Sequence, residues 1–287
     1  MYSRLPMTTD QHQERDPGPD ANDGPQPEPD WDALIKSAIG KVRPTIVGQR
    51  HIEGLSSASK PQKFQCDDGA LYAVKFFGNP DGDGRAIFTE QVTALLVRLI
   101  GAPVPEVRLV RITTELLEPL KIDFNGVPAT PGFHHGSRWA DNYSDRTDFI
   151  RYANENRAPL AALHLLYSWL YCTNDHQLIY CNTEPHNVLS VDHSRFLPGT
   201  TNWSSQSLLD HQDDFQRDPQ FASLNLGDDD YDAVLGRITA VASEEIADVV
   251  GTPPDEWGVS MTDRVALAGY IARRRIRLLA NFGRAAG

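Results

Sequence analysis

Two aspartates stand on either side of a short predicted hairpin in the second half of the chain. Asp175 precedes a β-rich run at residues 178–181, and a turn-like stretch follows it. A second β-rich run at 188–191 ends just before Asp192. Because the strands of a hairpin run antiparallel, both carboxylates are expected at the same end of it. One carboxylate could orient a hydroxyl group and the other could hold a metal ion, which is what phosphoryl transfer from ATP requires.

A lysine and a glutamate further upstream form a second candidate pair. Residues 69–77 predict a strand in which Lys75 points away from the aromatic and β-branched side chains, since neighbours on a strand face opposite ways. Glu90 lies in a predicted helix at 85–100, off its main apolar stripe and beside small apolar residues. A strand lysine held by a helix glutamate is how kinases grip the α- and β-phosphates of ATP. Either charge alone would be an ordinary surface residue, but together with the aspartates they favour a kinase-type site.

These residues belong to an ordered set of short motifs spread over about residues 42–282. The set resembles the HipA-like kinase domain of bacteria, in the compact branch without the additional N-terminal subdomain. The motifs are Val74-Lys75, Glu90, Val104-Pro105, Gly-Phe-His-His-Gly-Ser-Arg at 132–138, Asn-Asp-His-Gln at 174–177, Ser-Val-Asp-His-Ser at 190–194, and Trp257-Gly258. The resemblance implies a two-lobed, α+β protein-kinase-like fold, ATP and Mg²⁺ as cofactors, and transfer to a Ser or Thr hydroxyl.

The resemblance also implies a role for each matching residue. Lys75 takes the place of the phosphate-binding lysine, and Glu90 that of its partner on the helix. Asp175 takes the place of the catalytic aspartate, with His176 shaping its loop, and Asp192 that of the metal-binding aspartate. The phosphate acceptor, a protein or a small molecule, is not indicated by the sequence.

The loop expected to cover the phosphates falls at residues 54–59. It is rich in serine and has one glycine, so it is not a G-x-G-x-x-G loop. Kinases of the HipA type can be silenced by phosphorylation of a serine in this loop. The resemblance therefore implies nucleotide binding by this segment, with autophosphorylation as a hypothesis for its serines. The residues concerned are Gly54, Ser56, Ser57 and Ser59.

The second metal ligand of kinases is missing. An asparagine is expected five residues after Asp175, and Tyr180 stands there. Gln177 offers a carbonyl oxygen, a ligand that Mg²⁺ accepts, and Asn182 and Asn187 are further candidates. This departure leaves two alternatives open. The chain could be a pseudokinase that binds nucleotide and a partner protein, or a small-molecule phosphotransferase on the same fold.

Composition excludes several other classes of protein. The net charge of −12 and the pI near 5.1 argue against general nucleic-acid binding through phosphate contacts. Three scattered cysteines without C-x-x-C spacing indicate neither disulfides nor zinc. The nine histidines show no helical H-x-x-x-H pair, so His134 and His135 are not expected to bind zinc. No signal peptide or apolar span suggests a membrane, so a cytoplasmic protein is expected.

The chain divides into three predicted parts. Residues 1–30 are acidic, rich in proline and poor in large apolar residues, which predicts a disordered tail. Residues 31–130 form the expected nucleotide-binding lobe, mostly antiparallel sheet with one helix. Residues 131–287 form the expected helical lobe that carries the catalytic hairpin. Within them, residues 121–141 are expected to be rich in loops.

Helices are expected where apolar residues recur with helical spacing. In the larger lobe these segments are 145–156, 159–173, 229–249 and 261–282. His164 is expected to be a core residue, and His193 to orient the neighbouring Asp192. The basic run at 273–277 is expected to be a solvated face, with a docking site for an acidic substrate as the alternative.

Overall fold

The structure is a computed structural model, and it describes most of the chain outside the N-terminal tail. The described residues are 28–41, 43–57, 59–79, 84–145, 154–172, 177–215, 217, 218, 221 and 224–282. The predicted tail lies outside this range up to residue 27, and Asp175 and His176 lie outside it as well.

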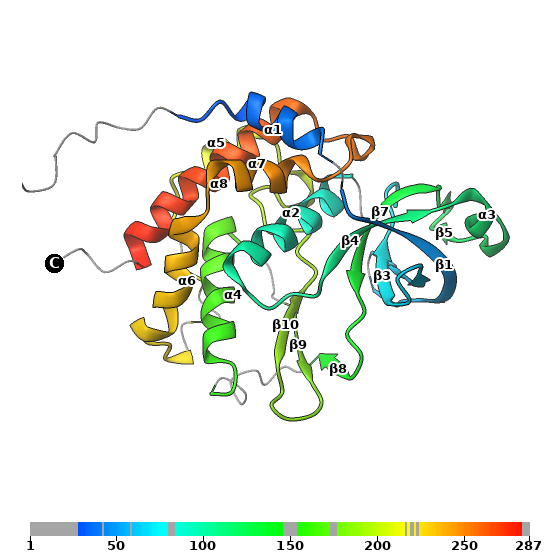
Figure 1. Ribbon diagram of the computed structural model, residues 1–287, viewed down its shortest axis with the longest axis horizontal. Helices are drawn as coiled ribbons and strands as arrows, with labels where there is room; N and C mark the ends of the chain where they lie inside the picture. Colours follow the sequence, from blue (N-terminus) through cyan, green and yellow to red (C-terminus); the bar gives the residue numbers. More distant parts are fainter. Residues whose placement is uncertain are drawn as a thin grey trace, which may run out of the picture.

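Five strands close into a barrel, seen at the right of Figure 1. Around the barrel, the strands are β1 (Thr45–Gly54), β2 (Gln62–Cys66), β3 (Leu71–Lys75), β7 (Gly132–Arg138) and β4 (Val107–Ile112). Strands β1 and β4 pair in parallel and the other neighbours pair antiparallel. Phe64, Val74 and Val110 are fully buried in one apolar cluster of the barrel. The barrel therefore has a small core of its own.

Strand β7 replaces part of the loop that was predicted at 121–141, so that prediction was wrong there. It bonds to β3 on one side and to β4 on the other. A Cβ atom on Gly136 would lie 2.2 Å from Cγ2 of Val110, so glycine allows the close approach of β7 and β4. The pairing also places residues 132–138 in the barrel, beyond the lobe boundary expected at 130.

Helix α2 (Gly84–Ile100) lies between the barrel and the other large helices (Figure 1). It is buried on nearly all sides, including both the apolar stripe and the face with Glu90. Phe88, Leu96 and Val97 belong to the main apolar core. Because both parts of the molecule pack on this helix, its position fixes where Glu90 stands relative to the barrel.

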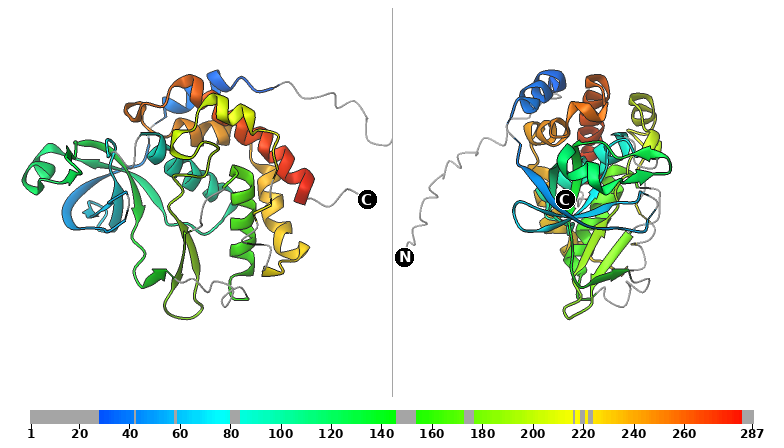
Figure 2. Two further views of the ribbon diagram at one scale, coloured as in Figure 1. Left: turned by 180° about the vertical axis from the view of Figure 1, so that it is seen from behind. Right: turned by 90° about the vertical axis from the view of Figure 1, so that its right-hand side faces the viewer.

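The remaining helices, apart from short α3 (Thr114–Leu117), gather on the side of α2 that faces away from the barrel (Figures 1 and 2). They are α1 (Trp31–Ile39), α4 (Arg157–Leu170), α5 (Ser205–Asp210), α6 (Asp228–Ala240), α7 (Ser243–Gly251) and α8 (Met261–Phe282). Asp30 caps α1 by accepting a hydrogen bond from Ala33 N at 3.0 Å, as predicted. No helix among the described residues has both the length and the apolar character needed to cross a membrane.

Two helix predictions were wrong in part. The segment predicted as one helix at 229–249 forms α6 and α7, with extended backbone at Val241 and Ala242 between them. Asp145 belongs to strand β8 (Tyr143–Asp145) and not to the helix predicted at 145–156, whose residues 146–153 lie outside the described residues. Short β8 pairs with the hairpin, and this long-range pairing places Asp145 in a strand.

The predicted hairpin is present. Strand β9 (Gln177–Cys181) pairs antiparallel with β10 (Val188–Val191), in a three-stranded sheet with β8 at one edge. Asn156, which is fully buried, fixes its turn: Oδ1 accepts from Val188 N at 2.8 Å and Nδ2 donates to His186 O at 3.0 Å.

Short elements complete the described chain. They are α3 (Thr114–Leu117), the two-stranded sheet of β5 (Asp123–Phe124) and β6 (Val127–Pro128), and single 3₁₀ turns at Glu118–Leu120, Thr200–Asn202 and Asp255–Trp257. Sheet β5–β6 and α3 lie at the end of the barrel farthest from the helices (Figure 1).

The basic run at 273–277 is not a uniformly solvated face. Arg274 is 1% exposed and donates to the carbonyl oxygens of Ser168 and Trp169, at 2.6 and 2.9 Å, at the end of α4. Arg273 and Arg277 both pair with Asp213 on the surface. Since a buried guanidinium needs acceptors, the run partly serves to hold the end of α4.

Candidate functional site

Lys75 joins the two carboxylates that the sequence singled out. Its Nζ donates to Oε1 of Glu90 in a close ion pair, and to Oδ1 of Asp192 at 2.7 Å. The three residues come from strand β3, helix α2 and the end of β10, so residues distant in sequence meet here. Three of the predicted site residues are therefore in direct contact.

Each element presents its side chain for a simple reason. Lys75 ends β3 on the face opposite the buried Val74, as the strand alternation predicted. Glu90 is 3% exposed on the face of α2 that small residues line. Asp192 follows β10 with a φ of 60°, a left-handed conformation that aspartate adopts more readily than most residues.

The ionic state of the pair follows from its surroundings. Burial by itself would lower the pKa of Lys75, but the carboxylates of Glu90 and Asp192 outweigh it and raise that pKa. Burial would likewise raise the pKa of Glu90, but Lys75 and other neighbouring groups hold it below the ordinary value. Lys75 and Glu90 are therefore both charged at neutral pH.

His193 connects this site to the core. Its main-chain N donates to Oε2 of Glu90 at 3.0 Å, while its ring Nε2 lies 2.9 Å from Oγ of Ser190. The hydroxyl of Tyr167 on α4 bonds to the same Ser190 oxygen. All three are buried, so a polar chain runs from α4 to Glu90. The sequence suggested a supporting role for His193, but it gave no signal for Tyr167 and none that the motif residue Ser190 would join the two.

The two neighbouring histidines of β7 are structural. His134 Nδ1 accepts from Phe77 N at 3.0 Å, and the ring packs against Phe76 inside the barrel. His135 faces the other way, opposite Lys75 in the ladder, with Nδ1 2.8 Å from Gln91 Oε1. Burial lowers the pKa of His134 to about 4 and that of His135 to about 3, so both are neutral at pH 7. The described residues contain no group of three or more His, Cys, Asp or Glu side chains suited to a metal ion.

The candidates for a second metal ligand are separated by the hairpin register. Gln177 pairs with Val191, so it lies beside the position of Asp192. Asn182 and Asn187 lie at the turn, the opposite end of the strands. Each strand residue advances the chain by about 3.3 Å, which places them too far from Asp192 to share its metal ion. Tyr180, next to the last residue of β9, is fully buried. Of the three candidates, Gln177 is therefore the one that lies at the same end of the hairpin as Asp192.

The serine-rich loop extends from the edge of the barrel where Lys75 lies. Gly54 pairs with Gln62, and Gln62 pairs with Val74, the residue before Lys75. Ser56 and Ser57 are exposed, and the carbonyl of Ser59 accepts from Asn79 at 2.7 Å. The loop therefore begins close to the candidate site, as a phosphate-covering segment must.

Asp175 and His176 belong to residues 173–176, outside the described residues. On the described sides of this segment, α4 ends just before Tyr171 and β9 begins at Gln177. The chain thus enters this segment from α4 and leaves it beside Asp192. Their predicted roles remain predictions.

Comparison with solved structures finds kinases. The chain is similar to the proinflammatory kinase CtkA of Helicobacter pylori, with a TM-score of 0.52 and 11% identity over 85% of this chain and 100% of that chain. It also matches the Golgi casein kinase, with 12% identity, 88% and 76% coverage and a TM-score of 0.38. The Mn/ADP-bound form of that kinase matches with 11% identity, 90% and 77% coverage and a TM-score of 0.42.

No protein-family model matches the sequence, and no curated protein matches it either. The similarity to CtkA, at its low identity, concerns the fold and not the activity. With its barrel, its central helix and its mixed content of helix and strand, the chain has an α+β, protein-kinase-like fold.

Proposed function

We propose that the chain is an atypical kinase of the HipA-like type. In this proposal it transfers the γ-phosphate of ATP, in the presence of Mg²⁺, to a Ser or Thr hydroxyl group, most simply on a protein. The observation that carries the proposal is the contact of Lys75 with both Glu90 and Asp192 within a kinase-like fold. A charged lysine that is held by a buried glutamate is suited to bind phosphate oxygens.

Lys75 and Glu90 would act as a unit toward the nucleotide. The carboxylate of Glu90 is buried and fixed from two sides, by Lys75 and by the main chain of His193. It keeps the ammonium group of Lys75 in place, where that group can donate to the α- and β-phosphate oxygens. Since Lys75 also contacts Asp192, the phosphate oxygens of a bound nucleotide would take over part of its hydrogen bonding.

Asp192 and Gln177 fit a magnesium ion by their chemistry. Carboxylate and amide oxygens are the ligands that Mg²⁺ prefers, and the hairpin register brings these two residues to one place. Mg²⁺, when bound, neutralises the negative charge that develops on the β- and γ-phosphates. Asp192 would hold it from one side, with Oγ of Ser194 3.3 Å from Oδ1 of the same carboxylate.

Asp175 would handle the proton of the acceptor. In the transfer, the acceptor oxygen forms a bond to the γ-phosphorus while the bond from that phosphorus to the β,γ-bridging oxygen breaks. ADP leaves, and the hydroxyl proton passes to the carboxylate of Asp175. His176 would shape the loop around it. This assignment predicts that Asp175→Asn abolishes transfer and leaves ATP binding intact.

The test begins with nucleotide binding. The midpoint temperature of thermal unfolding of the wild type should rise when ATP and Mg²⁺ are added. A ligand that binds the folded state adds to its stability, by about 2.7 kcal/mol at a hundred times its Kd. The metal-dependent shift should be lost in Lys75→Ala and in Asp192→Asn. Lys121→Ala and Asp141→Asn, which alter exposed residues of the same types, should keep it. No shift in the wild type at millimolar ATP contradicts the proposal.

Transfer is measured next, with ATP labelled at the γ-phosphate. Label on added protein substrates supports the proposed kinase, whereas label on a metabolite indicates a small-molecule phosphotransferase. Full transfer by Asp175→Asn would show that the catalytic aspartate is misassigned.

Autophosphorylation of the loop is tested by intact mass after incubation with ATP. An added phosphate that disappears in a triple Ala variant of Ser56, Ser57 and Ser59 supports modification of the loop, and Gly54 would then lie beside the modified residues. An unchanged mass of the wild type counts against autophosphorylation.

A second candidate function is that of a pseudokinase, a nucleotide-binding module that acts through a partner protein. One observation favours it. Tyr180 is fully buried where the metal-binding asparagine is expected, and Asn182 and Asn187 lie at the far end of the hairpin. Binding of ATP without any turnover would support this candidate.

A further inference from the structure

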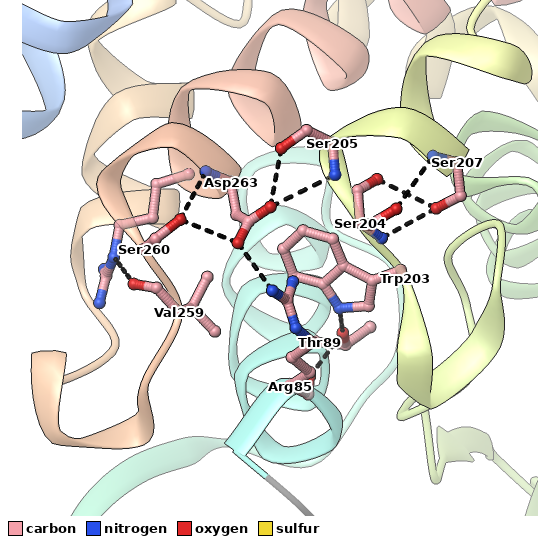
Figure 3. A network of polar contacts seen from close by, with 10 residues as sticks. Arg85, Thr89, Trp203, Ser204, Ser205, Ser207, Val259, Ser260 and Asp263 are labelled. Carbon is pink, nitrogen blue, oxygen red and sulfur yellow. Dashed lines mark hydrogen bonds and ion pairs between the residues drawn. The ribbon is translucent and has the colours of Figure 1, made fainter.

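The first two turns of α2 are held by residues from the last third of the chain. Arg85 donates to Oδ2 of Asp263 at 2.7 Å, and Asp263 lies in the first turn of α8. The guanidinium of Arg85 also lies 4.9 Å from the ring centroid of Trp203. Figure 3 shows Asp263 above Arg85, with Ser260 on one side of the carboxylate and Ser205 on the other.

Asp263 has its hydrogen-bonding capacity well filled. Its Oδ1 accepts from Oγ and N of Ser205, at 2.7 and 3.3 Å, and its Oδ2 accepts from Oγ of Ser260 at 2.9 Å as well as from Arg85. The residue is 8% exposed. Burial would raise the pKa of Asp263, but the bonds from Ser205, Arg85 and Ser260 outweigh it and lower that pKa. A partly buried carboxylate with these donors is a strong anchor.

Further contacts fix the same turns of α2. Nε1 of Trp203 donates to Oγ1 of Thr89 at 2.9 Å, and Trp203 is fully buried. The helix begins so close to the main chain of Trp257 that a Cβ atom on Gly84 would lie 1.8 Å from its carbonyl oxygen. The guanidinium of Arg264 lies 5.0 Å from the ring centroid of Phe88. The residues of α2 that come just before Glu90 are therefore fixed by contacts with other parts of the chain.

Trp203 and Ser205 follow Asp192 closely in the sequence, and this gives the contacts a second role. The chain leaves the site at Asp192, contacts α2 through Trp203, and starts α5 at Ser205. The Asp263 carboxylate therefore binds both the helix that carries Glu90 and the segment that follows Asp192.

We propose that Asp263 is a positioning residue for the site, one that holds α2 and the segment after Asp192 in the arrangement where Glu90 meets Lys75. This inference rests on the proposed function for its catalytic consequence.

The first experiment is hydrogen–deuterium exchange of the nucleotide-free protein, wild type against Asp263→Asn. We expect amides of residues 85–92 to exchange about tenfold faster in the variant, because the loss of a charged hydrogen-bond partner lowers the local opening free energy. Exchange in α4 and α6 should not change. Asp213→Asn, which removes the surface carboxylate that pairs with Arg273 and Arg277, should leave α2 unaffected.

The second experiment separates positioning from general stability. In transfer assays on folded Asp263→Asn, kcat/KM for ATP should fall about tenfold, and Asp263→Glu, which keeps the carboxylate, should restore part of it. If Asp263→Asn does not fold, the same measurements are made on Arg85→Gln, which removes the more exposed partner of the same ion pair.

The outcomes are distinct. Unchanged exchange in residues 85–92, or equal acceleration throughout the helices, would overturn the proposal. Hydrogen exchange is measured without nucleotide, so its result does not depend on the proposed function. The proposed function fails separately, when ATP causes no shift in the thermal unfolding of the wild type.

Discussion

The main-chain N–H of His193 lies 3.0 Å from Oε2 of Glu90, and the other oxygen of the same carboxylate bonds to Lys75. One buried side chain on α2 therefore contacts both the barrel lysine and the residue after Asp192. A displacement of α2 would break both contacts together, so the three parts of the site are expected to form or separate as a unit.

Removal of Lys75 from its buried ion pair with Glu90 is expected to destabilise the protein strongly. In Lys75→Met, Glu90 keeps its charge in a buried position and loses its cation, so we expect a loss of about 3–5 kcal/mol in the free energy of unfolding. The double variant Lys75→Met, Glu90→Leu should recover a substantial part of it, since no buried charge is left unpaired there. Urea unfolding of the four proteins in this cycle measures the coupling.

A surface pair provides the control. Lys41 pairs with Asp248 where both side chains are about half exposed, so Lys41→Met should cost less than about 1 kcal/mol. Equal losses for Lys41→Met and Lys75→Met would contradict the buried character of the Lys75 pair.

The barrel is expected to weaken in mild acid because of His134. Burial lowers its folded-state pKa from 6.5 to about 4, so the unfolded chain takes up the proton first. Its contribution to stability is therefore complete above about pH 6.5 and is lost as the pH falls toward 4, by about 2 kcal/mol at pH 5. Urea unfolding at pH 7.5 and pH 5 should show a smaller acid loss for His134→Gln than for the wild type.

The control for replacing a histidine by glutamine is His211→Gln, because His211 lies at the end of α5 and its side chain is only partly buried. That variant should lose as much stability in acid as the wild type. The assignment to His134 would be refuted by identical acid losses in His134→Gln and the wild type.

Replacement of Gly136 by alanine is expected to cause a steric clash that a second substitution relieves. Its Cβ position lies 2.2 Å from Cγ2 of Val110, so Gly136→Ala should destabilise the protein by about 1–3 kcal/mol. Val110→Ala removes that methyl group, so Gly136→Ala should destabilise a protein that already carries Val110→Ala less than it destabilises the wild type. Gly236→Ala, in α6 with open space around it, should instead be stabilising by about 0.5–1 kcal/mol. Thermal and urea unfolding distinguish the two glycines.

The side chain of Asn156 is expected to stabilise the hairpin turn. Its side chain bonds to the main chain at Val188 and His186, and Asn156→Ala leaves the buried N–H of Val188 without this acceptor. The expected loss is about 1–3 kcal/mol. Asn182→Ala, which removes an exposed side chain of the same hairpin that accepts a hydrogen bond from Oγ of Ser144, should cost much less. Equal losses would show that the contacts of Asn156 do not govern the turn.

Much of the fold could be predicted where local pattern and tertiary packing agree. The alternation in 71–75, the apolar stripes of α2 and α8, and the hairpin after Asp175 all led to the observed elements. For Lys75, Glu90 and Asp192, their types and order in the sequence led to residues that are in contact.

The missed features depend on partners distant in sequence. Strand β7 lacks clear alternation and is fixed by ladders to β3 and β4. Tyr167 and Ser190 each look like ordinary residues of a helix and a strand, and only the packing of α4 against β10 joins them to His193. Arg274 reads as part of a basic run, although its guanidinium is buried at the end of α4.

The parallel pairing of β1 with β4 has a consequence for how the protein forms. Closure of the barrel joins Thr45 to Leu109, and β7 must then fit between β3 and β4, so α2 lies within the loop that these pairings close. Contacts of such large sequence separation form slowly, because loop entropy is lost before they are made. During synthesis, a nascent chain that has not yet reached residue 138 cannot complete the ring of strands, and Lys75 gains its fixed surroundings only after that point.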